Sequence, residues 1–200
     1  MLFMLKKAIV SMLLLSVSCF SHAGLISADF RTESHLPTYS QSGAKTYQNL
    51  AAEIGGGAEL KNKHLLANPA NWGGGVVWMD FDPLSSILTL TSKDNWDFET
   101  FDAWMSNILF SESGESILGF SLLSNNLVTN GIQPILSYTA NSLHISYSSV
   151  PVFNFTGGQA TFLVQTGIAQ VPATVPEPAS LAIFGLALLG LGIGRRVSRR

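Results

Sequence analysis

The residues best suited to chemistry lie in a short acidic segment, DNWDFE, at residues 94–99. Carboxylate and amide oxygens are the ligands that calcium prefers, so the segment is a candidate calcium site. Its candidate ligands are Asp94, Asn95, Asp97 and Glu99. The spacing lacks the glycine and the final glutamate of an EF-hand loop. Asp and Asn also form turns without any ion, and this second explanation stays open.

Four tryptophans are candidates for sugar binding, because an aromatic ring offers a large apolar face and a polar edge. Trp72 lies in a loop-like stretch rich in Asn and Gly, and Trp96 adjoins a turn. These two are therefore the candidate ligand-binding residues. Trp78 and Trp104 are predicted to lie in the core. The alternative, that all four tryptophans pack the domain, is left open.

The sequence contains no Gly-x-Ser-x-Gly elbow, Walker loop or dinucleotide-binding fingerprint. His35, His64 and His144 occur singly, without the spacing of a zinc site. A glycosidase needs only a correctly spaced pair of carboxylates, and the sequence does not select such a pair. We therefore expect a noncatalytic protein with no cofactor other than the candidate calcium.

Short strands must position these residues. Apolar and polar residues alternate in several runs that are separated by Gly, Asn, Asp and Pro. Three hairpins are predicted, joining residues 76–81 to 87–91, 135–139 to 143–148, and 152–155 to 161–164. Closely spaced strands without sustained helices favour antiparallel sheets. The predicted fold class is mainly β, an antiparallel β-sandwich or jelly-roll-like domain.

Two segments have helical spacing instead. The apolar residues of the first precede three glycines and predict one short helix; they are Tyr47, Leu50, Ala51 and Ile54. The apolar residues of the second segment are Phe98, Phe101, Met105 and Ile108. For this segment we favour a strand, because the neighbouring segments are predicted strands.

The first 23 residues have the pattern of a secretory signal peptide. Lys6 and Lys7 precede an apolar run, and Ser21-His22-Ala23 offers small residues at the cleavage positions. We predict that signal peptidase cuts after Ala23. A lipoprotein signal at Cys19 is the alternative, although the leucine usual three residues earlier is missing. Cys19 is the only cysteine, so the mature protein would have none and could form no disulfide.

Charge is distributed unevenly along the chain. Between the two end segments there are five basic and twelve acidic residues, a net charge of −7. An acidic exported domain argues against nucleic acid or anionic lipid as its partner.

The C-terminal segment resembles a membrane anchor. Residues 179–194 are uncharged and apolar, and as a helix they would be ~24 Å long, slightly less than the ~30 Å hydrocarbon core. Hydrophobic mismatch of this size costs little. A basic tail at 195–200 follows, and with the middle of the chain exported it would stay in the cytoplasm. Its arginines are Arg195, Arg196, Arg199 and Arg200.

The residues before that apolar stretch bring a family resemblance. Pro176, Glu177 and Pro178, then a Gly- and Leu-rich span and the arginine cluster, closely resemble the PEP-CTERM sorting segment of Gram-negative bacteria. The resemblance implies that an exosortase, a membrane-embedded transpeptidase, recognises this motif, cuts near it and passes the exported domain to the cell surface. It also implies an association with exopolysaccharide and with biofilm or floc formation.

The sequence thus predicts four parts: a signal peptide at 1–23, an exported β-domain at 24–167, a linker at 168–175 and a sorting segment at 176–200. We expect transient anchoring in the membrane by the C-terminal helix, followed by a cell-surface or extracellular location. The expected partners are signal peptidase, exosortase, the membrane and exopolysaccharide, and nucleic acid is not among them. The expected function is that of a noncatalytic surface or matrix protein, with a displayed carbohydrate-binding module as the alternative.

Overall fold

A computed structural model describes residues 24–39 and 43–168. The predicted signal peptide, the sorting segment and the linker beyond Ile168 lie outside the described residues. Within them, the chain forms ten strands and one 3-10 helix. Their order is β1 (Leu25–His35), β2 (Lys45–Glu53), η1 (Asn62–His64), β3 (Leu65–Ala67), β4 (Val77–Asp82), β5 (Ile87–Ser92), β6 (Asp97–Phe110), β7 (Glu115–Asn125), β8 (Ile135–Thr139), β9 (Ser142–Asn154) and β10 (Gln159–Ile168).

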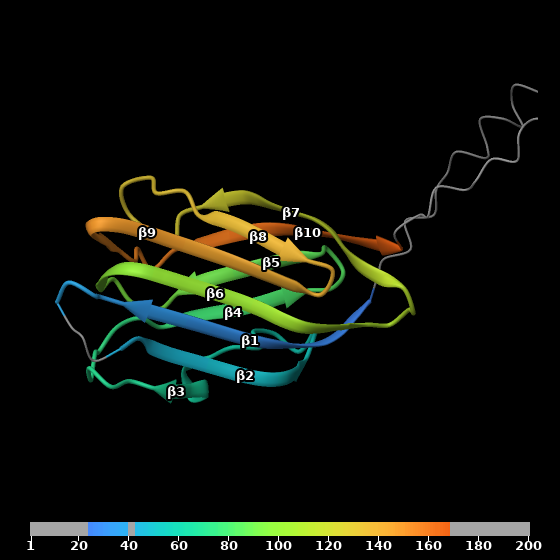
Figure 1. Ribbon diagram of the computed structural model, residues 1–200, viewed down its shortest axis with the longest axis horizontal. Coiled ribbons are helices and arrows are strands. Elements are labelled where there is room, and N and C mark those ends of the chain that lie inside the picture. Colours follow the sequence, from blue (N-terminus) through green and yellow to red (C-terminus); the bar gives the residue numbers. More distant parts are fainter. Residues whose placement is uncertain (1–23, 40–42, 169–200) are drawn as a thin grey trace, which may run out of the picture. The chain divides into compact units, whose positions relative to one another are not determined.

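The strands build two sheets in which every strand pair is antiparallel. The six-stranded sheet has the order β3-β2-β1-β6-β9-β8, and the four-stranded sheet has the order β4-β5-β10-β7 (Figure 1). The mainly β, antiparallel prediction is confirmed, and the arrangement is consistent with a β-sandwich.

The inward-facing side chains of both sheets form one hydrophobic core. Alternation along each strand supplies it: in β4, Val77, Met79 and Phe81 are buried while the residues between them are not. The centre of the core is aromatic. Phe155 packs edge-on against Phe101, with ring centroids 5.3 Å apart, and it also contacts the rings of Phe98 and Phe153.

Two of the three predicted hairpins are confirmed. Strands β4 and β5 pair across the turn at Asp82-Pro83, and β8 pairs with β9. The third is wrong, because β9 belongs to the six-stranded sheet and β10 lies between β5 and β7 in the other. The glycines at 157 and 158 do reverse the chain, but they carry it from one sheet to the opposite sheet.

The predicted helix around Tyr47 is also wrong, since this segment is strand β2. The register explains the misleading spacing: Ala28 and Phe30 of β1 face Ala52 and Asn49, so β2 carries one extra residue between them. Such a bulge interrupts the two-residue period and imitates a helical one. The strand preferred at residues 98–108 is confirmed as part of β6.

Strand β6 contains a similar irregularity. Ser27 and Asp29 of β1 face Leu109 and Ser106, so β6 also carries an extra residue opposite Asp29. Each bulge includes a residue with positive φ, Ala51 at 47° and Asn107 at 50°. Asp29 therefore lies between two bulged neighbours, and its carboxylate binds to both.

A buried carboxylate ties the loop after β2 to strand β4. Glu59 accepts hydrogen bonds from the backbone N–H of Phe81 at 2.9 Å and of Gly55 at 3.2 Å. Burial raises the pKa of Glu59, the two backbone hydrogen bonds oppose that rise, and the charge of Asp80 adds to it.

Both ends of the described domain lie at one end of the sheets (Figure 1). The Ser111 amide binds the Gly24 carbonyl at 2.8 Å, and Ile168 pairs with Glu115 at the start of β7. The loops around residues 72–75 and 94–96 lie at the opposite end, beside the first residues of β6.

Candidate ligand-binding site

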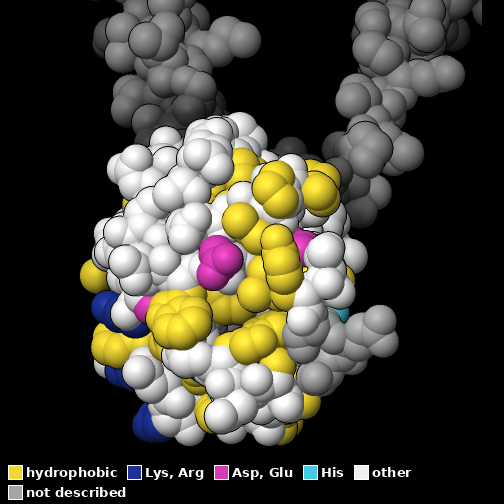
Figure 2. Space-filling model, turned by 90° about the vertical axis from the view of Figure 1, so that its left-hand side faces the viewer, with side chains coloured by type: hydrophobic (Ala, Val, Ile, Leu, Met, Phe, Trp, Pro, Cys, Tyr) yellow, Lys and Arg dark blue, Asp and Glu magenta, His cyan; other side chains and the backbone are white. Residues whose placement is uncertain are grey.

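The sequence-predicted site residues meet in the loops at that opposite end of the sandwich. Figure 2 looks onto this end, where hydrophobic side chains gather with acidic side chains among them and basic side chains lie along one edge. The loop before β4 carries Trp72 and three glycines, and the loop between β5 and β6 carries Trp96.

A buried lysine organises the glycine loop. The Lys45 Nζ donates to the carbonyls of Trp72 and Gly74, each at 2.8 Å, and to that of Gly73 at 3.3 Å. Lys45 is only 4% exposed. Burial lowers its pKa, whereas the nearby Asp94 charge raises it. Three consecutive carbonyls directed at one ammonium fix the path of the loop.

Trp96 rests on this loop. Its side chain is 53% exposed, and its indole lies directly against Gly73 and Gly74. A Cβ on Gly74 would overlap the Trp96 side chain, so glycine is required there for the ring to lie against the backbone. One side of the indole covers the loop, and much of the rest faces solvent.

Trp72 has a different environment. It packs against the hydrophobic core, edge-on to Phe98 with centroids 5.6 Å apart and tilted to His35 at 6.0 Å. The Asn68 amide brackets its backbone, accepting from the Trp72 N–H and donating to its carbonyl, both at 3.0 Å. Trp72 therefore supports the loop from beneath, while Trp96 is the ring presented to solvent.

The four candidate calcium ligands have separate surroundings. The Asp94 carboxylate accepts from the backbone N–H groups of Val76 at 2.8 Å and Trp96 at 3.3 Å, and so joins the two loops. Glu99 is buried and accepts from the Thr38 N–H at 3.3 Å. Asn95 is exposed and Asp97 is half-buried.

Across residues 24–39 and 43–168, His, Cys, Asp and Glu side chains form no group of three or more suited to a metal ion. Backbone N–H groups already occupy both oxygens of Asp94, as in a turn. The calcium site stays a prediction.

The remaining two tryptophans correct the sequence prediction, because neither lies in the core. Trp78 and Trp104 are half-buried on the outer faces of their sheets, since the core takes the alternate residues of β4 and β6. The Trp78 indole N–H donates to Asn62 and the Lys93 ammonium lies 3.9 Å from its ring centroid. The Trp104 ring stacks on His144 at 4.9 Å.

Sequence reasoning also missed a groove on the outer face of the six-stranded sheet, beside Trp104. It has a volume of about 490 Å³ and lies over β1, β2 and β6. Alternation along β1 could have placed Arg31 and Glu33 on an outer face. The neighbours that complete the groove depend on cross-strand register, which the sequence alone does not reveal.

Among the residues that the structure describes, no helix is long and apolar enough to cross a membrane. The predicted anchor at 179–194 lies outside them.

Comparison with known protein families finds a match on the C-terminal segment. The family described as the PEP-CTERM protein-sorting motif matches residues 174–200. The chain carries a PEP-CTERM sorting motif. This match agrees with the resemblance seen in Pro176, Glu177 and Pro178, and the motif suggests an exported protein that an exosortase sorts toward the cell surface. No curated protein and no solved structure matches the chain.

Proposed function

We propose that the protein is a noncatalytic component of the cell surface or extracellular matrix, sorted by an exosortase and associated with exopolysaccharide. The PEP-CTERM motif at residues 174–200, which follows the β-domain in the chain, carries this proposal. The signal peptide predicted at residues 1–23 supports it, because export must precede sorting at the membrane.

The described loop site supports a noncatalytic role. Its most prominent charged groups serve the backbone: Lys45 binds three carbonyls, and Asp94 binds two N–H groups. A general acid or base must instead reach a substrate with its titrating atom. These two side chains act as structural ties.

Mass spectrometry of the protein from envelope and extracellular fractions tests the sorting proposal. We expect a chain that lacks residues 1–23 and ends near Pro176–Pro178. Replacing Pro176, Glu177 and Pro178 together with alanine should abolish the C-terminal cut. Pro172→Ala, a proline change just before the matched segment, is the control and should be processed normally. Unchanged processing of the triple variant, or a surface chain that still ends at Arg200, would overturn the proposal.

A displayed carbohydrate-binding module is a second candidate, favoured by the exposed indole of Trp96. A flat, rigid ring on a glycine backbone offers the contact that the apolar face of a sugar needs. Trp96→Ala should then weaken binding on a glycan array, with Trp78→Ala as the matched control, because Lys93 covers the Trp78 ring. Trp72→Ala is not a suitable test, since loss of this core contact would disturb the loop itself. Equal glycan binding by the wild type and Trp96→Ala would show that the surface around Trp96 does not bind the glycan.

A further inference from the structure

The groove on the outer face of the six-stranded sheet is separate from the loop site. Trp104 lies eight residues after Trp96, which directly precedes β6, so an extended backbone separates their Cα atoms by about 26 Å. The groove volume of about 490 Å³ is within the range of small-ligand sites. The residues that matter for its chemistry are Asp29, Arg31, Glu33, Gln48, Trp104 and Asn107.

Two bulges and one carboxylate shape one end of the groove. Asp29 lies on β1 between the bulges of β2 and β6. One of its oxygens accepts the Ala51 N–H at 2.7 Å, and the other accepts the Asn107 side-chain amide at 2.7 Å. Each carboxylate oxygen can accept a further hydrogen bond. Asp29 is therefore a fixed acceptor, held in place before any ligand arrives.

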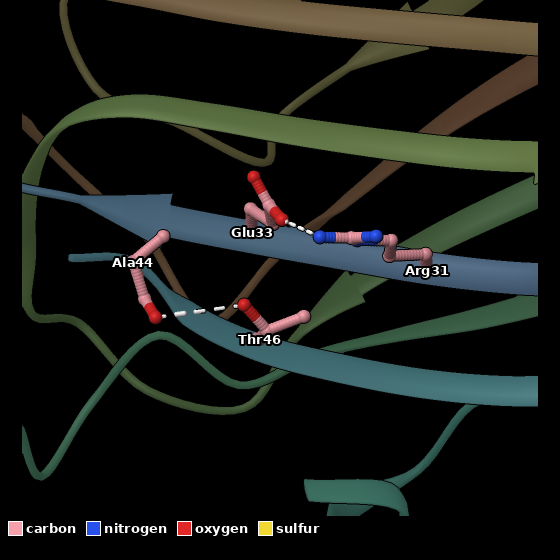
Figure 3. Close-up of polar contacts among 4 residues, drawn as sticks. All are labelled: Arg31, Glu33, Ala44 and Thr46. Atoms are coloured by element: carbon pink, nitrogen blue, oxygen red, sulfur yellow. Dashed lines mark hydrogen bonds and ion pairs between the residues drawn. The ribbon is translucent and has the colours of Figure 1, made fainter. Parts of the chain in front are cut away.

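The middle of the groove is a row of three residues on neighbouring strands. Arg31 of β1 faces Gln48 of β2 on one side and Trp104 of β6 on the other. The Arg31 guanidinium pairs with Glu33 on its own strand, as Figure 3 shows, and lies 5.7 Å from the Trp104 ring centroid. These contacts orient the guanidinium, and the Arg31 side chain is still 44% exposed.

Trp104 cannot act here as a stacking platform. Arg31 approaches the ring from β1, and His144 of β9, on the opposite side of β6, stacks nearly parallel to it at 4°. His144 is itself held by Asp102 at 2.9 Å. Because both neighbours already contact the Trp104 ring, we expect hydrogen bonds to supply most of the affinity.

The charges narrow the class of ligand. Two carboxylates, Asp29 and Glu33, accompany the single guanidinium of Arg31. An anionic ligand would meet excess negative charge in a domain that is already acidic, and an apolar ligand would leave the polar groups unpaired. A hydroxyl group both donates and accepts, so it can bind the carboxylates, the guanidinium and the amides in turn.

We propose that this groove binds a neutral, hydroxyl-rich glycan segment. The proposal deepens the carbohydrate-binding candidate and is independent of sorting by the exosortase. It places the contacts on Asp29, Arg31 and Gln48 rather than on Trp96. Because the ligand is neutral, its affinity should change little between low and high salt.

Titration of the purified full-length protein with neutral gluco-, galacto- and manno-oligosaccharides tests the proposal, with uronic-acid oligosaccharides for comparison. The test variant combines Arg31→Met, which keeps the aliphatic stem, with Gln48→Ala. The matched control is Gln159→Ala, on the outer face of the four-stranded sheet. Both variants should retain the wild-type far-UV circular dichroism, because all three side chains lie on outer faces.

We expect at least one neutral oligosaccharide to bind, with a Kd that rises about tenfold or more in the double variant and stays unchanged in Gln159→Ala. If binding is lost only in Trp96→Ala, the proposal that the groove binds the glycan is overturned and the loop site is favoured. Tighter binding of the uronic-acid oligosaccharides than of the neutral ones would overturn the proposal that the ligand is neutral. A wild-type protein that binds none of the probes would overturn both carbohydrate sites, while processing at Pro176–Pro178 would still stand as a separate result.

Discussion

Replacing Lys45 with methionine tests how the glycine loop is held. The aliphatic part of the side chain is kept, and the ammonium that binds the carbonyls of residues 72–74 is removed. We expect the loop to lose its anchor and the free energy of unfolding to fall. The neighbouring Trp96 ring should lose its fixed position, because it rests on the same backbone.

The size of the effect follows from the environment of each carbonyl. A hydrogen bond to a charged group contributes about 1.5–3 kcal/mol. The hydrogen bond to the Gly74 carbonyl is buried and should contribute its full free energy. The hydrogen bonds to the Trp72 and Gly73 carbonyls are partly buried, so water can bind these carbonyls in the variant and reduce the loss. Relief of the buried charge offsets some of the loss, since burial lowers the pKa of Lys45. A net loss of about 3 kcal/mol is expected.

Urea unfolding, followed by far-UV circular dichroism, measures this loss. With an m-value of ~2 kcal/mol/M, the midpoint should fall by about 1.5 M. Lys63→Met is the control, because Lys63 is exposed, and its free energy of unfolding should stay within about 0.5 kcal/mol of the wild type. A Lys45→Met protein as stable as this control would refute the idea that Lys45 holds the loop.

Three further predictions concern other parts of the fold. Burial raises the folded-state pKa of Glu59 above its ordinary 4.5, so the contribution of Glu59 to stability is largest below that pH and is lost as pH rises through the folded pKa. Urea midpoints at acidic and neutral pH should therefore show that the wild type loses stability relative to Glu59→Gln as the pH rises. A difference between the two proteins that does not change with pH would contradict this. Gly74→Ala should lower the free energy of unfolding by about 1–3 kcal/mol through overlap with Trp96, and by much less when Trp96→Ala is also present. Gly56→Ala is the control and should change the free energy of unfolding very little, because the space around Gly56 is open. Phe155→Ala should cost about 3–5 kcal/mol in the same assay, because Phe155 packs against three other core phenylalanines, and a loss below ~1 kcal/mol would show that the core closes around the gap.

Local signals in the sequence were sufficient for β4, β5, β6, β8, β9 and β10 and for two hairpins, but not for β1, β2, β3 and β7. Alternation and the Asp82-Pro83 turn predict the β4–β5 pair because the two strands are neighbours along the chain. The turn at residues 157–158 gives an equally clear local signal, yet it joins strands of different sheets. Sheet membership depends on which distant strand provides a hydrogen-bonding edge, and β10 finds one on β5 and another on β7.

A bulge accounts for the wrongly predicted helix at β2, and β6 has a similar irregularity. The extra residues at Ala51 and Asn107 shift the buried positions of β2 and β6 out of strict alternation. The sequence shows this shift only as irregular spacing, which indicates a helix equally well. The same bulges bring Asp29 to the groove, so the features that misled the sequence prediction also shape the groove.

The loop site was partly predictable. An exposed position for Trp96 was expected from its place beside a turn, and the structure has it exposed. The packing of Trp72 against the core was left open as an alternative, because its contacts with Phe98 and His35 join segments far apart in the sequence. Lys45 gave no signal at all, since a lone lysine at the start of a strand is normally solvated.

The placement of the chain ends has a mechanical consequence. Ile168, from which the chain runs on to the sorting motif, ends β10, a strand with a partner on each side, and the Trp96 loops lie at the far end of the sheets. A pull on the C-terminal tail against a load held at those loops would act along the strand axis. The hydrogen bonds from β10 to β5 and β7 would then be sheared together instead of opening one at a time, so the domain is attached to its tail in the direction in which a β-sheet resists force best.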